Sequence, residues 1–122
     1  MREETSSSFR WRPTLSSQQK LRNKMKELFA VILRHGTAWQ ASRSLEEQGD
    51  WKAHRPFMNA LEEEGFVVPG GPLKGTDDVL LIFRATIPEE IVDRLSADPW
   101  HRRDLLRVSR VTPWELRLGS LQ

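Results

Sequence analysis

The 122-residue sequence contains no cysteine. That absence excludes disulfide bonds, thiol nucleophiles and cysteine-ligated metal sites. Long hydrophobic runs are also missing, since the longest, Leu28 to Leu33, is far shorter than the roughly 20 residues a membrane-spanning helix needs. The N-terminus has no apolar stretch of the kind that forms a secretory signal. Together these absences predict a cytoplasmic protein with no membrane partner.

Positive and negative side chains nearly balance in number over the whole chain, but they are distributed unevenly along the sequence. The 19 Lys and Arg residues and 17 Asp and Glu residues give a formal net charge of +2. Residues 1–27 hold seven bases and three acids, so the other 95 residues carry a net charge of −2. We therefore predict a basic, poorly ordered N-terminal arm over residues 1–25 and a single domain over residues 26–122. Met25, just before the first expected strand, is a second candidate start of the chain.

Apolar patterning divides the domain into strands and helices. Two continuous apolar runs, 28–33 and 79–83, are typical of strands buried on both faces. The expected elements are strand 28–33, helix 51–64, strand 66–68, strand 79–83, helix 87–97 with Ile91, Val92 and Leu95 toward the core, and strand 105–118 with Trp114, Leu116 and Leu118 on one face. This β-α-β-β-α-β order predicts an α+β, ferredoxin-like domain, in which two helices cover one face of a four-stranded antiparallel sheet.

Capping residues and prolines set the expected ends of these elements. Asp50 suits the N-cap of the first helix and Gly65 its C-terminal stop. Pro56 predicts a kink there, or a helix that begins only after it. Further boundaries are a helical turn begun by Ser44 with Glu47 in loop 36–50, a turn at Asp77-Asp78, a capping box of Thr86 with Glu89, a helix end at Asp98-Pro99, and a bulge or sheet edge at Pro113.

The two apolar strands also bear on oligomeric state. Helices on one side would leave the other apolar face of the sheet exposed, and monomeric soluble proteins rarely expose a large apolar patch. We therefore predict that two chains pack sheet against sheet, as a homodimer with the shape of a barrel.

Three histidines, His35, His54 and His101, are the candidates for proton transfer. His54 on the first helix and Asp98 after the second form the natural pair, because a carboxylate can orient an imidazole. Spacing alone favours a core-facing His54 and an Asp98 that caps backbone amides. A metal site of His54, Asp98 and His101 is a weaker alternative, because no ligand pair has the close spacing typical of such sites. We expect no metal and no nucleotide cofactor.

The segment from Gly70 to Thr76, Gly-Gly-Pro-Leu-Lys-Gly-Thr, looks superficially like a phosphate-binding loop. It departs from that pattern because its lysine does not directly precede Ser or Thr, and because Pro72 removes an amide that would bind phosphate. We expect its glycines to let the chain bend or to let a ligand approach the backbone closely.

Several short segments together resemble the YCII-related (YciI-like) family of the dimeric α/β-barrel superfamily, whose relatives include muconolactone isomerases. They are Gln48-Gly-Asp-Trp-Lys-Ala-His54, Phe57-Met-Asn-Ala-Leu-Glu-Glu-Glu-Gly-Phe66, Gly70-Gly-Pro-Leu73, Ala97-Asp-Pro-Trp100 and Pro113-Trp114. The resemblance covers about residues 26–119. It implies a face-to-face dimer whose pocket holds His54 as acid/base, with Asp98 fixing its tautomer, and Trp51, Gly71, Pro72 and Trp100 as pocket residues.

The function we expect is a small cofactor-independent enzyme of isomerase, lyase or hydrolase type. It would perform general acid/base chemistry with a His-Asp dyad on a small carbonyl, lactone or quinone-like compound. The alternative is a non-catalytic ligand-binding or interaction module that uses the same pocket. A nucleic-acid partner for the basic arm is not favoured, since bases and aromatic residues do not recur there in a regular stripe.

Overall fold

The structure, a computed structural model, describes residues 26–121. The basic arm predicted over residues 1–25 and the alternative start at Met25 lie outside the described residues. Within the part that is described, no helix has the length and apolar character needed to cross a bilayer.

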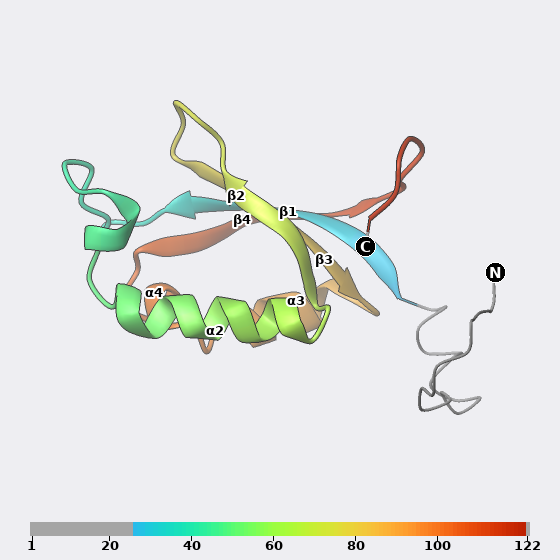
Figure 1. Ribbon diagram of the computed structural model, residues 1–122, viewed down its shortest axis with the longest axis horizontal. Helices are drawn as coiled ribbons and strands as arrows, with labels where there is room; N and C mark the ends of the chain where they lie inside the picture. Colours follow the sequence, from blue (N-terminus) through green and yellow to red (C-terminus); the bar gives the residue numbers. More distant parts are fainter. Residues whose placement is uncertain (1–25, 122) are drawn as a thin grey trace, which may run out of the picture.

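Four strands form a single antiparallel sheet in the order β2-β3-β1-β4 (Figure 1). Their bounds are β1 Glu27–His35, β2 Val67–Pro72, β3 Asp78–Ala85 and β4 Leu106–Trp114. The two apolar runs of the sequence become the central strands β1 and β3, where ladder bonds on both sides satisfy the backbone. The α+β class and the four-stranded antiparallel sheet are confirmed, and the element order is compatible with a ferredoxin-like fold.

The helices all lie on one side of this sheet (Figure 1). They are α2 Trp51–Glu63, α3 Pro88–Leu95 and the short α4 Pro99–Arg102, and a 3-10 turn, η1 Leu45–Glu47, precedes α2. The expectation of two helices omitted α4. That helix begins at Pro99, because proline is tolerated in the first turn and Asp98 serves as the N-cap.

The core fills the space between helices and sheet. Along β1, Phe29, Val31 and Leu33 are at most 2% exposed, and their alternate neighbours are half-buried. We call the helix side of the sheet, with Phe29, Val31, Leu33, Leu81, Phe83 and Ala85, the covered face, and the other side, with Leu28, Ala30, Ile32, Leu80 and Ile82, the open face. The strand period of two residues assigns each apolar run to both faces.

The first helix differs from the expectation at its N-terminus. It begins at Trp51 and runs through Pro56 without interruption, so the expectation of a helix starting only after Pro56 is wrong. Asp50 occupies the N-cap position with a left-handed backbone (φ 60°), but its side chain makes no capping bond. Its carboxylate instead binds the Arg103 guanidinium, with 2.9 Å between Oδ2 and Nη1. Gly65, at φ 78°, ends the helix as expected.

The second helix also differs. The capping box of Thr86 with Glu89 is wrong, because the Thr86 N–H donates to Oε1 of Glu90 at 3.2 Å and Ile87 is the N-cap. The helix ends at Leu95. Ile91 and Leu95 are fully buried, whereas Val92 is 44% exposed and does not belong to the core.

Three other boundaries shift by a few residues. The turn expected at Asp77-Asp78 lies at Leu73 to Thr76, where the Thr76 N–H donates to the Leu73 carbonyl. Asp78 is already the first residue of β3. The last strand ends at Trp114, so Leu116 and Leu118 do not continue it. Pro113 lies on an edge strand as expected, but the register shift occurs at Ile32/Leu33 in the β1–β4 pair.

Candidate functional site

His54 and Asp98, which are 44 residues apart in the sequence, are in direct contact. The Nδ1 atom of His54 lies 2.9 Å from Oδ1 and 2.8 Å from Oδ2 of Asp98. Helix α2 supplies the histidine, and the turn between α3 and α4 supplies the carboxylate. Because Nδ1 faces Asp98, the other ring nitrogen, Nε2, is the one left for a ligand.

Asp98 is fully buried and held from several sides. Its Oδ1 accepts a hydrogen bond from the Trp100 backbone N–H at 3.2 Å, which makes it the N-cap of α4. The Nδ1 atom of His101 lies 3.5 Å from Oδ2. Burial by itself raises the pKa of the Asp98 carboxyl, but contacts with His101, His54 and the Trp100 N–H outweigh it, so that the pKa is lowered. The favoured state of Asp98 is therefore the carboxylate, which accepts a hydrogen bond from His54 Nδ1.

Trp100 forms the wall behind the imidazole. The His54 ring stacks on the Trp100 indole, with 3.7 Å between ring centroids and 5° between planes. The indole is held in turn by its Nε1–H, which donates to the Gly49 carbonyl at 2.6 Å. Trp39 meets Trp100 edge-on at 5.5 Å, and Trp51 is tilted against it at 5.7 Å. Stacking on Trp100 thus fixes the plane of the His54 imidazole, and the contact with Asp98 fixes its tautomer.

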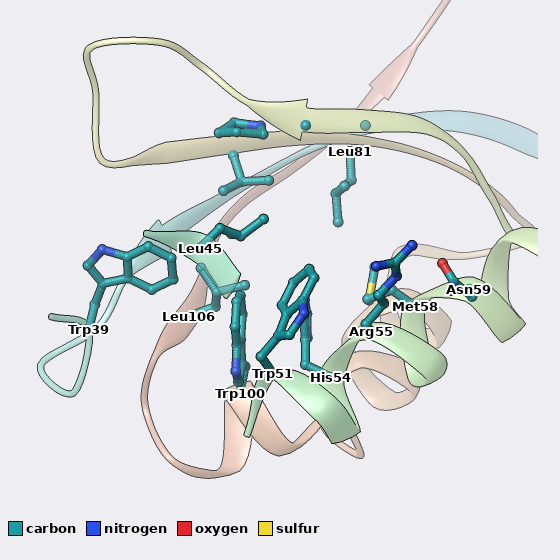
Figure 2. A pocket seen from close by; sticks show the side chains of 14 residues that line it. Trp39, Leu45, Trp51, His54, Arg55, Met58, Asn59, Leu81, Trp100 and Leu106 are labelled. Atoms are coloured by element: carbon teal, nitrogen blue, oxygen red, sulfur yellow. The ribbon is translucent and has the colours of Figure 1, made fainter. Parts of the chain in front are cut away.

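A pocket with a volume of about 250 Å³ opens between α2 and the sheet, and His54 is part of its lining (Figure 2). Its aromatic lining is Trp39, Trp51 and Trp100, and its aliphatic lining is Leu45, Met58, Val79, Leu81 and Leu106. The strand segment Gly70-Gly71-Pro72 closes it on the sheet side, while Arg55 and Asn59 complete it along α2. The structure thus places Trp51, His54, Gly71, Pro72 and Trp100 around one cavity, with Asp98 buried behind the imidazole.

The glycine segment of β2 owes its composition partly to packing. A Cβ atom at Gly70 would overlap Cδ2 of Leu81 and lie 3.1 Å from the Leu80 carbonyl oxygen, so a larger residue would require the Leu81 side chain to move and would crowd the backbone of β3. At Gly71 no atom lies within 4 Å of such a Cβ. Gly70 therefore allows β2 and β3 to approach closely, whereas the packing imposes no such requirement at Gly71.

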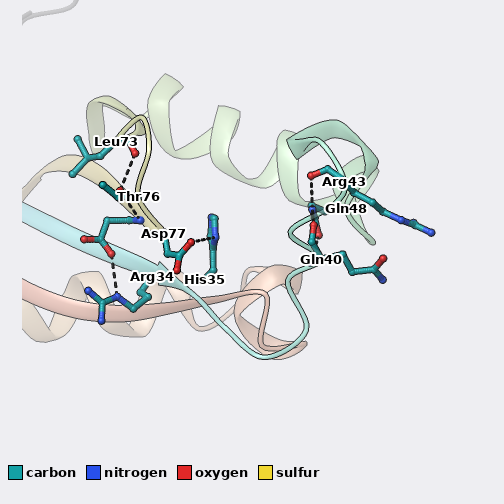
Figure 3. Close-up of polar contacts among 9 residues, drawn as sticks. Arg34, His35, Gln40, Arg43, Gln48, Leu73, Thr76 and Asp77 are labelled. Carbon is teal, nitrogen blue, oxygen red and sulfur yellow. Dashed lines mark hydrogen bonds and ion pairs between the residues drawn. The ribbon is translucent and has the colours of Figure 1, made fainter.

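A buried glutamine organises the loop that carries Trp39 and Leu45 (Figure 3). The Gln48 side chain, on a residue 3% exposed, accepts from the Gln40 N–H at 3.0 Å and donates to the Gln40 carbonyl at 2.8 Å and the Arg43 carbonyl at 3.2 Å. Glu47 accepts from the Ser44 N–H at 3.0 Å, as the expected helical turn requires. This loop has no regular strand or helix beyond η1, so these side-chain bonds hold Trp39 at the pocket.

Arg55, Asn59 and Trp39 are among the lining residues that the sequence analysis did not predict. Arg55 and Asn59 follow Trp51 at successive four-residue steps along α2, and that spacing is a signal that could have placed them on its pocket side. Trp39 lies in an irregular loop, where no periodic pattern indicates the direction of its side chain.

His101 does not line this pocket, although it contacts Asp98. Both its ring nitrogens are buried, and neither has a hydrogen bond within the described part of the chain. No group of three or more His, Cys, Asp or Glu side chains among residues 26–121 has an arrangement that could hold a metal ion. The weaker alternative of a metal site at His54, Asp98 and His101 therefore gains no support.

His35 lies near the other end of the pocket, at the end of β1. Its ring stacks on Trp39 with 3.8 Å between centroids, and its Nδ1 is 3.6 Å from Oδ1 of Asp77 (Figure 3). Burial lowers the pKa of His35, although Asp77 and Asp78 act in the opposite direction. The neutral imidazole is thus the form that the fold favours at this position.

No family model matches the sequence, and no curated protein does so.

Proposed function

We propose that the chain is a small-molecule enzyme in which His54 is the general acid/base and Asp98 its positioning partner. The observation that carries this proposal is the contact of His54 Nδ1 with both oxygens of a fully buried carboxylate, on an imidazole that lines a pocket. A buried charge is costly unless it is paired, and the contact with His54 pairs the Asp98 carboxylate. The resemblance to the YCII-related family supports the same two roles.

In the proposed chemistry, Nδ1 carries a hydrogen toward Asp98 and the neutral Nε2 accepts a proton from the ligand. The carboxylate stabilises the imidazolium that results, and the imidazolium returns the proton to another atom of the ligand or to a leaving oxygen. A small carbonyl, lactone or quinone-like compound provides an acidic C–H and an oxygen that can accept charge. The proposed reaction uses no cofactor, and the cytoplasmic location stays a prediction from the sequence.

A non-catalytic binding module is the second candidate. It is favoured by the apolar character of the lining, where the polar side chains are His54, Arg55 and Asn59. It is also favoured by the close stacking of His54 on Trp100, since the imidazole then forms part of the wall as any aromatic residue would. In this alternative Asp98 and His54 stabilise the fold and no proton moves.

Hydrogen–deuterium exchange distinguishes the two candidates because it detects the proposed removal of a C–H proton directly. Small carbonyl, lactone and quinone compounds are incubated with the protein in D₂O, and loss of the C–H signal is followed by NMR. We expect the wild type to catalyse exchange and His54→Gln to be about 10²- to 10⁴-fold slower, because glutamine keeps a donor for Asp98 but offers no proton acceptor.

The matched control is Lys52→Gln, an exposed substitution on the same helix that leaves the pocket unchanged. It should retain wild-type exchange. Binding of these compounds without exchange by the wild type, or exchange that His54→Gln leaves unchanged, would reject the enzyme in favour of the binding module.

We further propose that a second copy of the chain covers the open face. Leu28, Ala30, Ile32 and Leu80 of this face are half-buried in the single chain, and pairing of two such faces would remove them from water. Light scattering should give twice the chain mass of 14.2 kDa. Ile32→Lys should yield a monomer and Lys52→Glu, on the helix side, should not. A wild type that is monomeric at micromolar concentration would exclude the dimer.

A further inference from the structure

The arginine at the pocket, Arg55, has no acidic partner among residues 26–121. It lines the pocket, and the contact found for its guanidinium in this part of the chain is with the Trp51 ring, with 6.0 Å from Cζ to the ring centroid. Other arginines form ion pairs with 2.6–3.0 Å between nitrogen and oxygen; these are Arg34 with Asp78, Arg94 with Glu64, Arg103 with Asp50 and Arg107 with Asp104. Arg55 therefore has its donors available for a ligand.

The surroundings of Arg55 favour an anion. Asn59 lies one helical turn further along α2 and lines the same pocket, so its amide is adjacent to the guanidinium (Figure 2). Among the described residues no carboxylate belongs to the lining, and Asp98 is buried behind His54. The remaining walls are indole rings and aliphatic side chains, which suit the uncharged part of a ligand.

We propose that Arg55, with Asn59, is a binding site for a carboxylate, so that the ligand of this pocket is an organic acid with an apolar ring. The ring lies among Trp39, Trp51 and Trp100, and the carboxylate lies at Arg55. Arginine suits this role because its planar guanidinium matches a carboxylate with two parallel hydrogen bonds. The carboxylate site rests on the proposed function only in that the organic acid would be the substrate. Binding of the acid can be measured without turnover.

The test compares two probes of nearly equal shape, 2-naphthoate and the uncharged 2-naphthamide, by isothermal titration calorimetry. The wild type should bind the carboxylate about tenfold or more tightly than the amide, since hydrogen bonds to charged groups contribute about that much. Arg55→Gln should abolish the preference and leave amide binding unchanged. Asn59→Asp should also weaken naphthoate binding, because it places a competing carboxylate one turn from Arg55.

Lys52→Gln removes an equal charge from the same helix away from the pocket and should keep the preference. Both probes are measured by binding alone, so failure of the proposed catalysis leaves this result intact. Three outcomes would overturn the carboxylate site: no binding of either probe to the wild type, equal affinity for both, or equal loss of the preference in Arg55→Gln and Lys52→Gln. In the last two cases Arg55 serves only to cover the Trp51 ring, and a lower unfolding temperature of Arg55→Gln would show that role.

Discussion

The two faces of the sheet carry similar apolar residues in different surroundings. On the covered face, Val31 and Leu33 are at most 1% exposed beneath the helices. On the open face, Leu28, Ala30 and Ile32 alternate with them along the same strand and remain half-buried. The pocket, the buried carboxylate and the three histidines are also on the helix side of the sheet. Composition thus determines that β1 is apolar on both sides, while the helices determine which side becomes a core and a site.

The strongest test of this difference compares two neighbouring residues. Leu33→Ala on the covered face should lower the free energy of unfolding by about 2–5 kcal/mol, because it leaves a cavity in a packed core. Ile32→Ala on the open face should cost less in the single chain, and its penalty should grow at protein concentrations where the proposed dimer forms. Urea unfolding at a low and a high protein concentration measures both. Equal penalties that do not depend on concentration would contradict the distinction between the faces.

The second test removes the negative charge of Asp98, which is buried on the helix side of the sheet. Asp98→Asn should destabilise the protein by about 1–3 kcal/mol near neutral pH, because it replaces bonds to a carboxylate with neutral ones. Asp78→Asn is the matched control, since Asp78 pairs with the exposed Arg34 side chain at 3.0 Å and should contribute less.

Asp98→Asn and wild type should also differ in how the melting temperature depends on pH in the acid range. The pKa of Asp98 is lowered from 3.8 in the folded state, so its contribution is complete above that value and is lost as pH falls through the lower folded pKa. Asp98→Asn should therefore make the fall in melting temperature below about pH 4 shallower. Part of the fall should remain, because hydrogen bonds with Arg107 and Thr37 also lower the pKa of Asp104. Identical acid profiles for wild type and Asp98→Asn would show that Asp98 is not ionised in the fold.

Strands and helices could be predicted from the sequence because their signals are periodic. Leu28 to Leu33 and Val79 to Phe83 became the central strands, and His54 and Leu61 are buried on the helix that was expected over residues 51–64. The short α4 was missed because its four residues are fewer than a periodic pattern requires, although Asp98-Pro99 is a typical helix start. The capping bonds expected at Asp50 and Thr86 are not formed, because the Asp50 carboxylate pairs with Arg103 and because Glu90, not Glu89, accepts from the Thr86 N–H.

The candidate site was predictable where its residues are on regular helices and not where they are in an irregular loop. His54 and Asp98 were paired by residue type and then by resemblance, since nothing in their 44-residue separation shows that they meet. Trp39 reaches the pocket through a loop whose conformation depends on the Gln48 side chain, and sequence periodicity does not describe such a loop. Residues on regular helices can thus be assigned to a face, whereas residues in irregular loops need the structure.

The smallest expected effect concerns His35, the covered-face residue at the end of β1. Its folded pKa is lowered from 6.5 by burial, so the unfolded chain takes up a proton more readily, and the stabilisation present above pH 6.5 is lost as pH falls through the folded pKa. His35→Phe, which keeps an aromatic ring against Trp39, should reduce the stability difference between pH 7 and pH 5 by less than about 1 kcal/mol. Asp77→Asn should enlarge that difference, because Asp77 favours the charged imidazole. Urea unfolding at the two pH values measures both variants, and an unchanged pH dependence in His35→Phe would assign the titration to another group on the covered face.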